Sequence, residues 1–178
     1  PTPRFYTLSP AAATEAAPAK ANYTVGVGLV TVPEMVDRPQ LVVRVDANRV
    51  ALMEQERWAE PLQSGIGQVI AANLSRLLAG AWVSAYPQSS TINSDYQVVV
   101  DVQRFDSVPG TAASVDVLWK VRNAQGVVVK AGRSTVSEPT QGSGNDALVA
   151  AHDRALAAYE LAARLPEQVA LRQKPGEG

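Results

Sequence analysis

The sequence predicts an α/β domain in which two long helices pack on a single mixed, largely antiparallel sheet. Three segments between residues 95 and 136 alternate apolar and polar side chains, which is typical of half-buried strands. Two other segments, 61–78 and 145–165, repeat apolar residues at helical spacing. The chain has 178 residues, of which 46% are hydrophobic, so one domain with a sizeable aliphatic core is expected.

The N-terminal third reads as short strands separated by turns. Residues 3–8 form a short strand, and the Ala- and Pro-rich stretch 9–21 forms a linker. A strand over 25–32 carries Gly26 and Gly28 on one face, which indicates the close approach of another element. Residues 34–39 form a turn or a short helical piece. Strands 40–45 and 49–53 then flank a tight turn at 46–48.

The remaining elements follow from helix and turn signals. Pro61 opens the first helix, and Gly80 follows it as a stop signal. Strands 95–105, 114–122 and 127–136 form an antiparallel meander, since their connections are short. Asn145 is a suitable N-cap for a second helix that ends near Leu165, before Pro166. We therefore expect an N-terminal strand and linker over 1–21, one domain over 22–168, and a flexible tail over 169–178.

The composition excludes several classes of site. The chain has no Cys and one His, so disulfides, Cys nucleophiles, Fe–S ligation and an ordinary structural zinc site are unavailable. The net charge is -1 and no basic patch stands out, so no nucleic-acid partner is expected. No apolar run approaches the roughly 20 residues that span a bilayer. The sequence predicts no cofactor and no metal.

Catalytic motifs are also absent. His152 lies within the apolar stripe of the second helix, and no Gly-x-Ser-x-Gly nucleophile motif accompanies it. We expect it to be a histidine at the edge of the core rather than a member of a triad. Gly26 and Gly28 lie inside a strand, so they are packing glycines rather than a dinucleotide fingerprint.

Two further groups have a functional and a structural interpretation. Glu54, Glu56 and Glu60 surround Arg57, and paired carboxylates can act as acid and base. Near a strand-to-helix junction, ion pairing and capping are the more common role, and we favour it. The three tryptophans could line a ligand groove, but core packing is the favoured interpretation for them; they are Trp58, Trp82 and Trp119.

Three motifs resemble one known family. They are Arg4-Phe5-Tyr6-Thr7-Leu8, then Val25-Gly26-Val27-Gly28 with Val32-Pro33-Glu34 and the run from Asp37-Arg38-Pro39 to Arg44, and finally Glu56-Arg57-Trp58-Ala59-Glu60-Pro61-Leu62. In this order and spacing they resemble the ABC-type transport auxiliary lipoprotein family, the PqiC-like proteins. The likeness continues through 95–105, Trp119 and the last helix, so it covers nearly the whole chain.

The resemblance implies a fold similar to the N-terminal, anticodon-binding-like domain of TolB, a mixed sheet sandwiched by helices. It implies an exported protein, lipidated on an N-terminal Cys and held at the inner leaflet of the outer membrane. The lipidation Cys is missing here, so we interpret Pro1 as the start of a trimmed chain and infer the anchor. The family has no known catalytic residues. Seven motif residues are expected to be structural: Asp37, Arg38, Pro39, Arg57, Trp58, Glu60 and Pro61.

The partners that the resemblance implies are an MCE-domain protein and ABC transporter components that move lipids between the two membranes. We expect a non-catalytic, protein-binding adaptor, with self-association as a further expectation. The alternative is a module that binds lipid or a small hydrophobic molecule in a cavity between sheet and helix. A pocket under the first helix favours this alternative, whereas an exposed apolar patch or a free sheet edge favours the adaptor.

Overall fold

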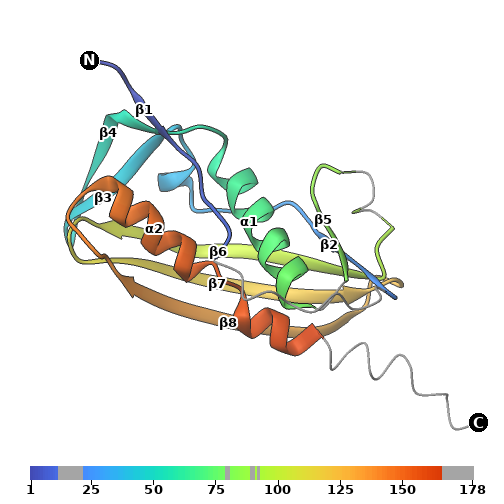
Figure 1. The fold of residues 1–178 in the computed structure, drawn as a ribbon. Helices are drawn as coiled ribbons and strands as arrows, with labels where there is room; N and C mark the ends of the chain where they lie inside the picture. The colour runs from blue at the N-terminus through green and yellow to red at the C-terminus, as the bar shows by residue number, and fades with distance from the viewer. Residues whose placement is uncertain (12–21, 79–80, 89–90, 92, 166–178) are drawn as a thin grey trace, which may run out of the picture.

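The computed structural model describes residues 1–11, 22–78, 81–88, 91 and 93–165. Its main layer is a mixed five-stranded sheet in the order β5-β2-β6-β7-β8 (Figure 1). A smaller sheet has the order β1-β4-β3. The chain order of the elements is β1 Arg4–Tyr6, β2 Thr24–Val27, η1 Glu34–Val36, β3 Gln40–Asp46, β4 Arg49–Trp58, α1 Leu62–Leu77, β5 Trp82–Ala85, β6 Tyr96–Val108, β7 Ala112–Asn123, β8 Val128–Pro139 and α2 Asn145–Ala155.

The antiparallel meander is confirmed and forms most of the larger sheet. β6, β7 and β8 pair in sequence, with Val100 opposite Trp119 and Trp119 opposite Gly132. The inward side chains of β6 alternate with more exposed ones, and Val98 and Val100 are almost completely buried. This alternation is the physical basis of the sequence prediction, because successive side chains of a strand point to opposite faces.

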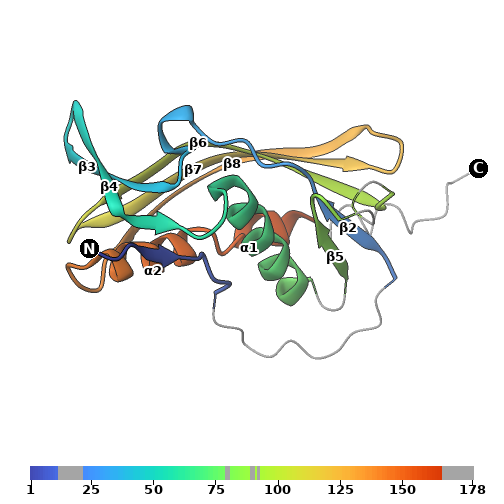
Figure 2. The ribbon, with the colours of Figure 1, turned by 90° about the horizontal axis from the view of Figure 1, so that it is seen from above.

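Both helices lie on the same face of the five-stranded sheet, rather than on two faces as the resemblance implies (Figure 2). The buried stripe of α1 includes Ile66 and Leu74, neither of which is exposed to solvent. Leu148 of α2 is buried to the same extent. The α/β class is therefore confirmed, and its core is the layer of aliphatic side chains between this sheet face and the two helices.

The prediction of a single sheet is wrong, because β3 and β4 form a separate sheet with β1. β4 continues past Met53 to Trp58, through a polar stretch in which Arg4, Phe5 and Tyr6 of β1 pair with residues 56–58. This partner comes from about 50 positions earlier in the chain, so the alternation of β4 alone gives no sign of it. An ion pair between Arg44 Nη2 and Asp106 Oδ1, at 3.6 Å, links the two sheets.

Three other elements differ from the sequence prediction. β2 ends at Val27 rather than at residue 32, and beyond it only Thr31 forms a bridge, to Asp101. β5 was not predicted and pairs in parallel with β2. α2 ends at Ala155, and Ala158 then adopts a left-handed φ of 63° before a helical segment over 159–165. Gly80, Pro166 and the predicted tail lie outside the described residues.

The segment that follows β1 runs across both helices. Leu8 is buried in the core cluster. The Ser9 amide donates a hydrogen bond to Asp153 Oδ1 of α2 at 2.8 Å, and the Ala11 amide donates to Asn73 Oδ1 of α1 at 3.0 Å. Asn73 in turn donates through Nδ2 to the Leu156 carbonyl at 2.9 Å. β1 and the segment that follows it, residues 4–11, therefore connect β4, α1 and α2.

Candidate functional site

Six of the seven motif residues come together around one hollow where β4 leads into α1. The hollow has a volume of about 360 Å³ and is lined by 37–39 and 58–62. These two segments are about 20 positions apart in the sequence. The motif residues in its lining are Asp37, Arg38, Pro39, Trp58, Glu60 and Pro61. We call this feature the motif hollow; Arg57 does not line it.

Backbone hydrogen bonds hold the walls of the motif hollow together. The Trp58 amide donates to the Pro39 carbonyl at 2.7 Å, and the Ala59 amide donates to the Tyr6 carbonyl at 2.9 Å. Trp58 is buried, and its ring packs edge-to-face on Phe105 with centroids 6.2 Å apart. Pro61 occupies the N-cap position, and its carbonyl accepts from the Ser64 amide at 3.0 Å. These contacts connect the residues that follow η1 with the end of β4 and the start of α1.

The motif hollow carries one guanidinium and two carboxylates. The Arg38 Nε atom is buried and has no hydrogen-bond partner among the described residues. Glu60 lies over the first turn of α1, with its Oε1 atom 3.4 Å from the position that a Cβ on Gly65 would take. A carboxylate at this position interacts favourably with the helix dipole. The hollow offers polar recognition groups, and its lining contains no Ser, Thr, His or Lys.

Two of the three carboxylates of the acidic cluster form ion pairs, whereas Glu60 lies in the lining of the motif hollow. Arg57 Nη2 lies 3.6 Å from Glu54 Oε2, and Arg57 Nε donates to the Glu54 carbonyl at 2.9 Å. The buried carboxylate of Glu56 accepts a hydrogen bond from Arg4 Nε at 2.9 Å. This bond to Arg4 holds the pKa of Glu56 below its usual value. The cluster therefore has the geometry of ion pairing that the sequence favoured.

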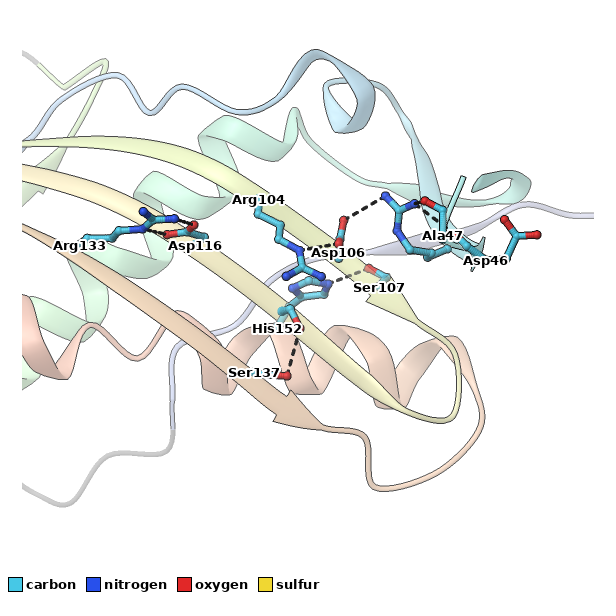
Figure 3. Close-up of polar contacts among 11 residues, drawn as sticks. Asp46, Ala47, Arg104, Asp106, Ser107, Asp116, Arg133, Ser137 and His152 are labelled. Carbon is cyan, nitrogen blue, oxygen red and sulfur yellow. Dashed lines mark hydrogen bonds and ion pairs between the residues drawn. The ribbon is translucent and has the colours of Figure 1, made fainter. Parts of the chain in front are cut away.

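His152 is buried at the centre of the α2–sheet contact, not at the edge of the core. Its Nε2 atom lies 2.7 Å from Ser107 Oγ, and its ring stacks on Phe105 with the ring centroids 3.8 Å apart. Figure 3 shows the contact between His152 and Ser107. A triad would need a carboxylate on Nδ1, but that atom is buried without a partner. Asp106 instead binds Arg104 Nε at 2.6 Å. The pair of His152 and Ser107 is a hydrogen bond inside the core, and neither residue lines a described pocket.

Packing explains one of the two glycines, Gly26, and two of the three tryptophans. A Cβ on Gly26 would lie 2.6 Å from Ser94 Oγ, so a close approach does require glycine there. At Gly28 a Cβ would lie 3.7 Å from the Val98 carbonyl oxygen, an ordinary contact, so the prediction of a packing glycine is wrong there. Trp58 and Trp119 are buried, as predicted. The prediction is wrong for Trp82, whose side chain is 70% exposed because it begins β5 at the edge of the larger sheet.

β8 forms a free edge of the larger sheet, which the sequence analysis did not identify as an edge. β8 pairs with β7 on one side, and no strand of the described part of the chain pairs with its other side. The Thr140 amide donates to the Thr111 carbonyl and so points toward β7. Because amide directions alternate along a strand, the amides of every second residue of β8 point away from β7. Pro139, which has no amide hydrogen, occupies one of these outward-facing positions. Proline at the end of a strand is the sequence signal of such an edge.

Within the described ranges, no group of three or more His, Cys, Asp or Glu side chains could hold a metal ion. The same ranges contain no helix that is both long enough and apolar enough to cross a membrane.

Comparisons with known proteins give one family and one fold. The sequence model of the ABC-type transport auxiliary lipoprotein component family matches residues 6–165. No curated protein matches the chain. Protein XCC0632 from Xanthomonas campestris has a similar crystal structure, with a TM-score of 0.75, 20% identity, and coverage of 96% of this chain and 99% of that one. The structure of an uncharacterized protein has a TM-score of 0.73 at 21% identity, covering 95% and 99%. At these identities the two structures show the fold alone.

Proposed function

The chain belongs to the ABC-type transport auxiliary lipoprotein component family, and from this we infer that it is a non-catalytic adaptor of an intermembrane lipid transport system. In this proposal the domain is held at the inner leaflet of the outer membrane. There it binds the MCE-domain protein, which works with the ABC transporter to move lipids between the two membranes. The observation that carries the proposal is the family match, which extends over both sheets and both helices.

The chemistry of the described residues supports binding rather than turnover. The one histidine is enclosed in the core, and its Nδ1 atom has no carboxylate partner. Two of the three carboxylates of the acidic cluster, those of Glu54 and Glu56, are paired with arginines. The motif hollow offers a guanidinium and two carboxylates. Polar groups of this kind are typical of the rim of a protein–protein interface.

We assign partner binding to the free edge of β8. This strand is 12 residues long, and a strand edge of that length can accept an added strand. At its last residue the Pro139 carbonyl already accepts a hydrogen bond from Arg154 Nη2 at 2.8 Å. The edge strand of the smaller sheet, β3, is less suitable. β3 does lie at the end of its sheet, but Leu41, Val42 and Val43 are buried and its Arg44 is paired to β6.

A pull-down with the cognate MCE-domain protein tests the proposal, using the domain without a lipid anchor. Ala131 is exposed and shares the outward-facing amide position of Pro139, so Ala131→Pro removes one donor from the free edge without breaking a bond to β7. Ala131→Ser keeps the donor and is the matched control. We expect wild type and Ala131→Ser to capture the partner and Ala131→Pro to capture much less.

Three results would count against this assignment. If the wild-type domain captures no MCE protein, the adaptor role is wrong. If Ala131→Pro binds as well as Ala131→Ser, the β8 edge is not the contact surface. If sedimentation shows instead that Ala131→Pro separates an oligomer into monomers, the edge joins copies of this chain.

The anchor is tested in the gene. We expect the precursor to encode a signal peptide and a Cys shortly before the residue numbered 1, because the resemblance implies that such a Cys carries the lipid anchor. Stable attachment to a bilayer needs more than one acyl chain. A cytosolic Met start without such a Cys would remove the anchor from the proposal.

A further inference from the structure

An apolar pocket lies where α2 ends and the chain crosses the face of β7 and β8. After Ala155 the helix stops, and Ala158 takes a left-handed φ of 63° before the 159–165 segment begins. This break leaves a pocket of about 260 Å³ between 154–161 and the sheet. A non-glycine residue in that conformation is strained, and such strain is concentrated at functional sites.

The floor of the apolar pocket carries no charge. It is formed by Val100, Val117, Trp119 and Val136 of the sheet, with Ile70 from α1. Val100, Trp119 and Ile70 are at most 4% exposed. The indole of Trp119 lies flat against β8 because the residue opposite it is Gly132, where a Cβ would come within 2.3 Å of the ring. A larger residue at 132 would displace the indole from the floor.

Polar groups are confined to the rim. Ser134 Oγ donates to Glu160 Oε2 at 2.7 Å, and Arg154 Nε lies 3.5 Å from Glu138 Oε2. The side chain of Tyr159 is 65% exposed beside them. An apolar floor with a polar, hydrated rim is complementary to an amphiphile whose apolar end is inserted and whose polar end stays in water.

The volume limits the size of the occupant. A dry cavity of about 150 Å³ holds benzene, whereas drug-sized ligands occupy roughly 300–1,000 Å³. The pocket lies between these limits, so it is too small for a whole phospholipid. We propose that the apolar pocket binds the terminal hydrocarbon segment of a single acyl chain, with the polar end of the amphiphile at the Arg154–Glu138 rim. This site goes beyond the protein-binding role.

The test uses cis-parinaric acid, a fluorescent fatty acid, and the purified wild-type domain. Excitation of tryptophan should produce energy transfer to the bound probe, because Trp119 forms part of the floor. Unlabelled oleate should displace the probe if the site takes free fatty acids. Displacement by dioleoyl phosphatidylglycerol vesicles but not by oleate would identify a phospholipid as the source of the chain. Either pattern supports the proposal.

Matched variants locate the site. Ala157→Leu introduces a larger side chain at a buried position of the pocket wall, whereas Ala150→Leu makes the same change at an exposed position of α2. Loss of space for two or more methylenes should weaken probe binding at least about tenfold in Ala157→Leu and leave Ala150→Leu unchanged. If Ala157→Leu does not fold, Ala155→Leu fills the pocket from the last residue of α2.

Two results would overturn the proposal. One is the absence of saturable, displaceable energy transfer in the wild-type domain. The other is equal affinity of the pocket-filling variant and Ala150→Leu for the probe. The pull-down with the MCE-domain protein is independent of both, so failure of the acyl-chain site and failure of the adaptor role are distinguishable.

Discussion

The single histidine should make the stability of the domain depend on pH in a defined way. His152 is 1% exposed, and burial lowers its pKa from 6.5 to about 3, against the weaker attraction of Asp106. In the unfolded chain its pKa returns to the ordinary value. Between pH 6.5 and 3 the unfolded state therefore binds a proton that the folded state does not. As the pH falls across this window, the free energy of unfolding should decrease by about 1.4 kcal/mol for each pH unit.

A neighbouring carboxylate acts in the opposite direction. Burial raises the pKa of Asp153 from 3.8 to about 6, although the Ser9 amide partly offsets this effect. The folded state then binds a proton before the unfolded state as the pH falls through 6, which stabilises the fold. Asp153 is only half-buried, so solvent screening makes its contribution smaller than that of His152. The wild-type slope should accordingly be shallower than that of His152 alone.

The perturbation that isolates the histidine is His152→Gln, which keeps a polar side chain that does not titrate. Urea unfolding, followed by tryptophan fluorescence at several values from about pH 7 to about pH 5, gives the slopes for both proteins. Relative to the variant, wild type should lose about 2 kcal/mol between pH 6.5 and pH 5. The one imidazole can also be followed directly by NMR. An imidazole that titrates near its ordinary value, or equal slopes in the two proteins, would refute the reasoning.

Three other substitutions have defined outcomes. Trp58→Ala removes a buried ring that packs on Phe105 and should lower the free energy of unfolding by about 3–5 kcal/mol; a variant with the wild-type melting temperature and no partner binding would instead make Trp58 a contact residue. Gly132→Ala places a Cβ 2.3 Å from the Trp119 ring and should destabilise by about 1–3 kcal/mol in denaturant unfolding, while Gly144→Ala, with open space around it, should change stability far less. Arg4→Met leaves Glu56 buried without its cation. Because Arg4 lowers the pKa of Glu56, the variant should show its full loss of stability relative to wild type above pH 4.5, the ordinary pKa of Glu. This difference in stability should vanish as the pH falls through the lowered pKa that Glu56 has in the folded wild type. Thermal melts at about pH 7 and about pH 3 test this last prediction, with Arg49→Met in an exposed ion pair as the control.

The elements with strong local patterns could be predicted from the sequence. The meander and α1 carry uninterrupted alternation or helical spacing, and their physical cause is burial on one side only. β5 could not be found in this way, because Trp82 and Val83 are followed by Ser84 and Ala85, a short stretch whose exposed edge position gives no alternation. Its strand conformation depends on pairing with β2, which is distant in the sequence.

The break in α2 also has no local signal. Residues 154–163 are rich in Ala and Leu, which favour helix, and contain no Gly or Pro. The helix nevertheless stops at Ala155, where Asn73 of α1 donates to the Leu156 carbonyl and so satisfies an acceptor at the helix end. A tertiary hydrogen bond, absent from any local pattern, accompanies the end of α2 and the apolar pocket beside it.

The candidate site, like the fold, could be predicted from the sequence only in part. The resemblance identifies the motif residues, but spacing alone does not reveal that they share one hollow, where the Trp58 amide donates to the Pro39 carbonyl. His152 was placed in the apolar stripe correctly but not deeply enough, because stacking on Phe105 of β6 is a contact between distant segments.

The segment of residues 4–11 has a mechanical consequence. β1 runs parallel to β4, and the bonds of Ser9 and Ala11 to the two helices follow directly after it. When a pulling force applied before Arg4 is resisted at a point in line with β1, the hydrogen bonds of the β1–β4 ladder are loaded in shear and share the load. In the opposite geometry, a hairpin pulled apart from its open end, the bonds would break one after another. Tension on the N-terminal side is thus distributed into the smaller sheet, α1 and α2 together, and a domain attached in this way would transmit force as one body rather than unravel from its end.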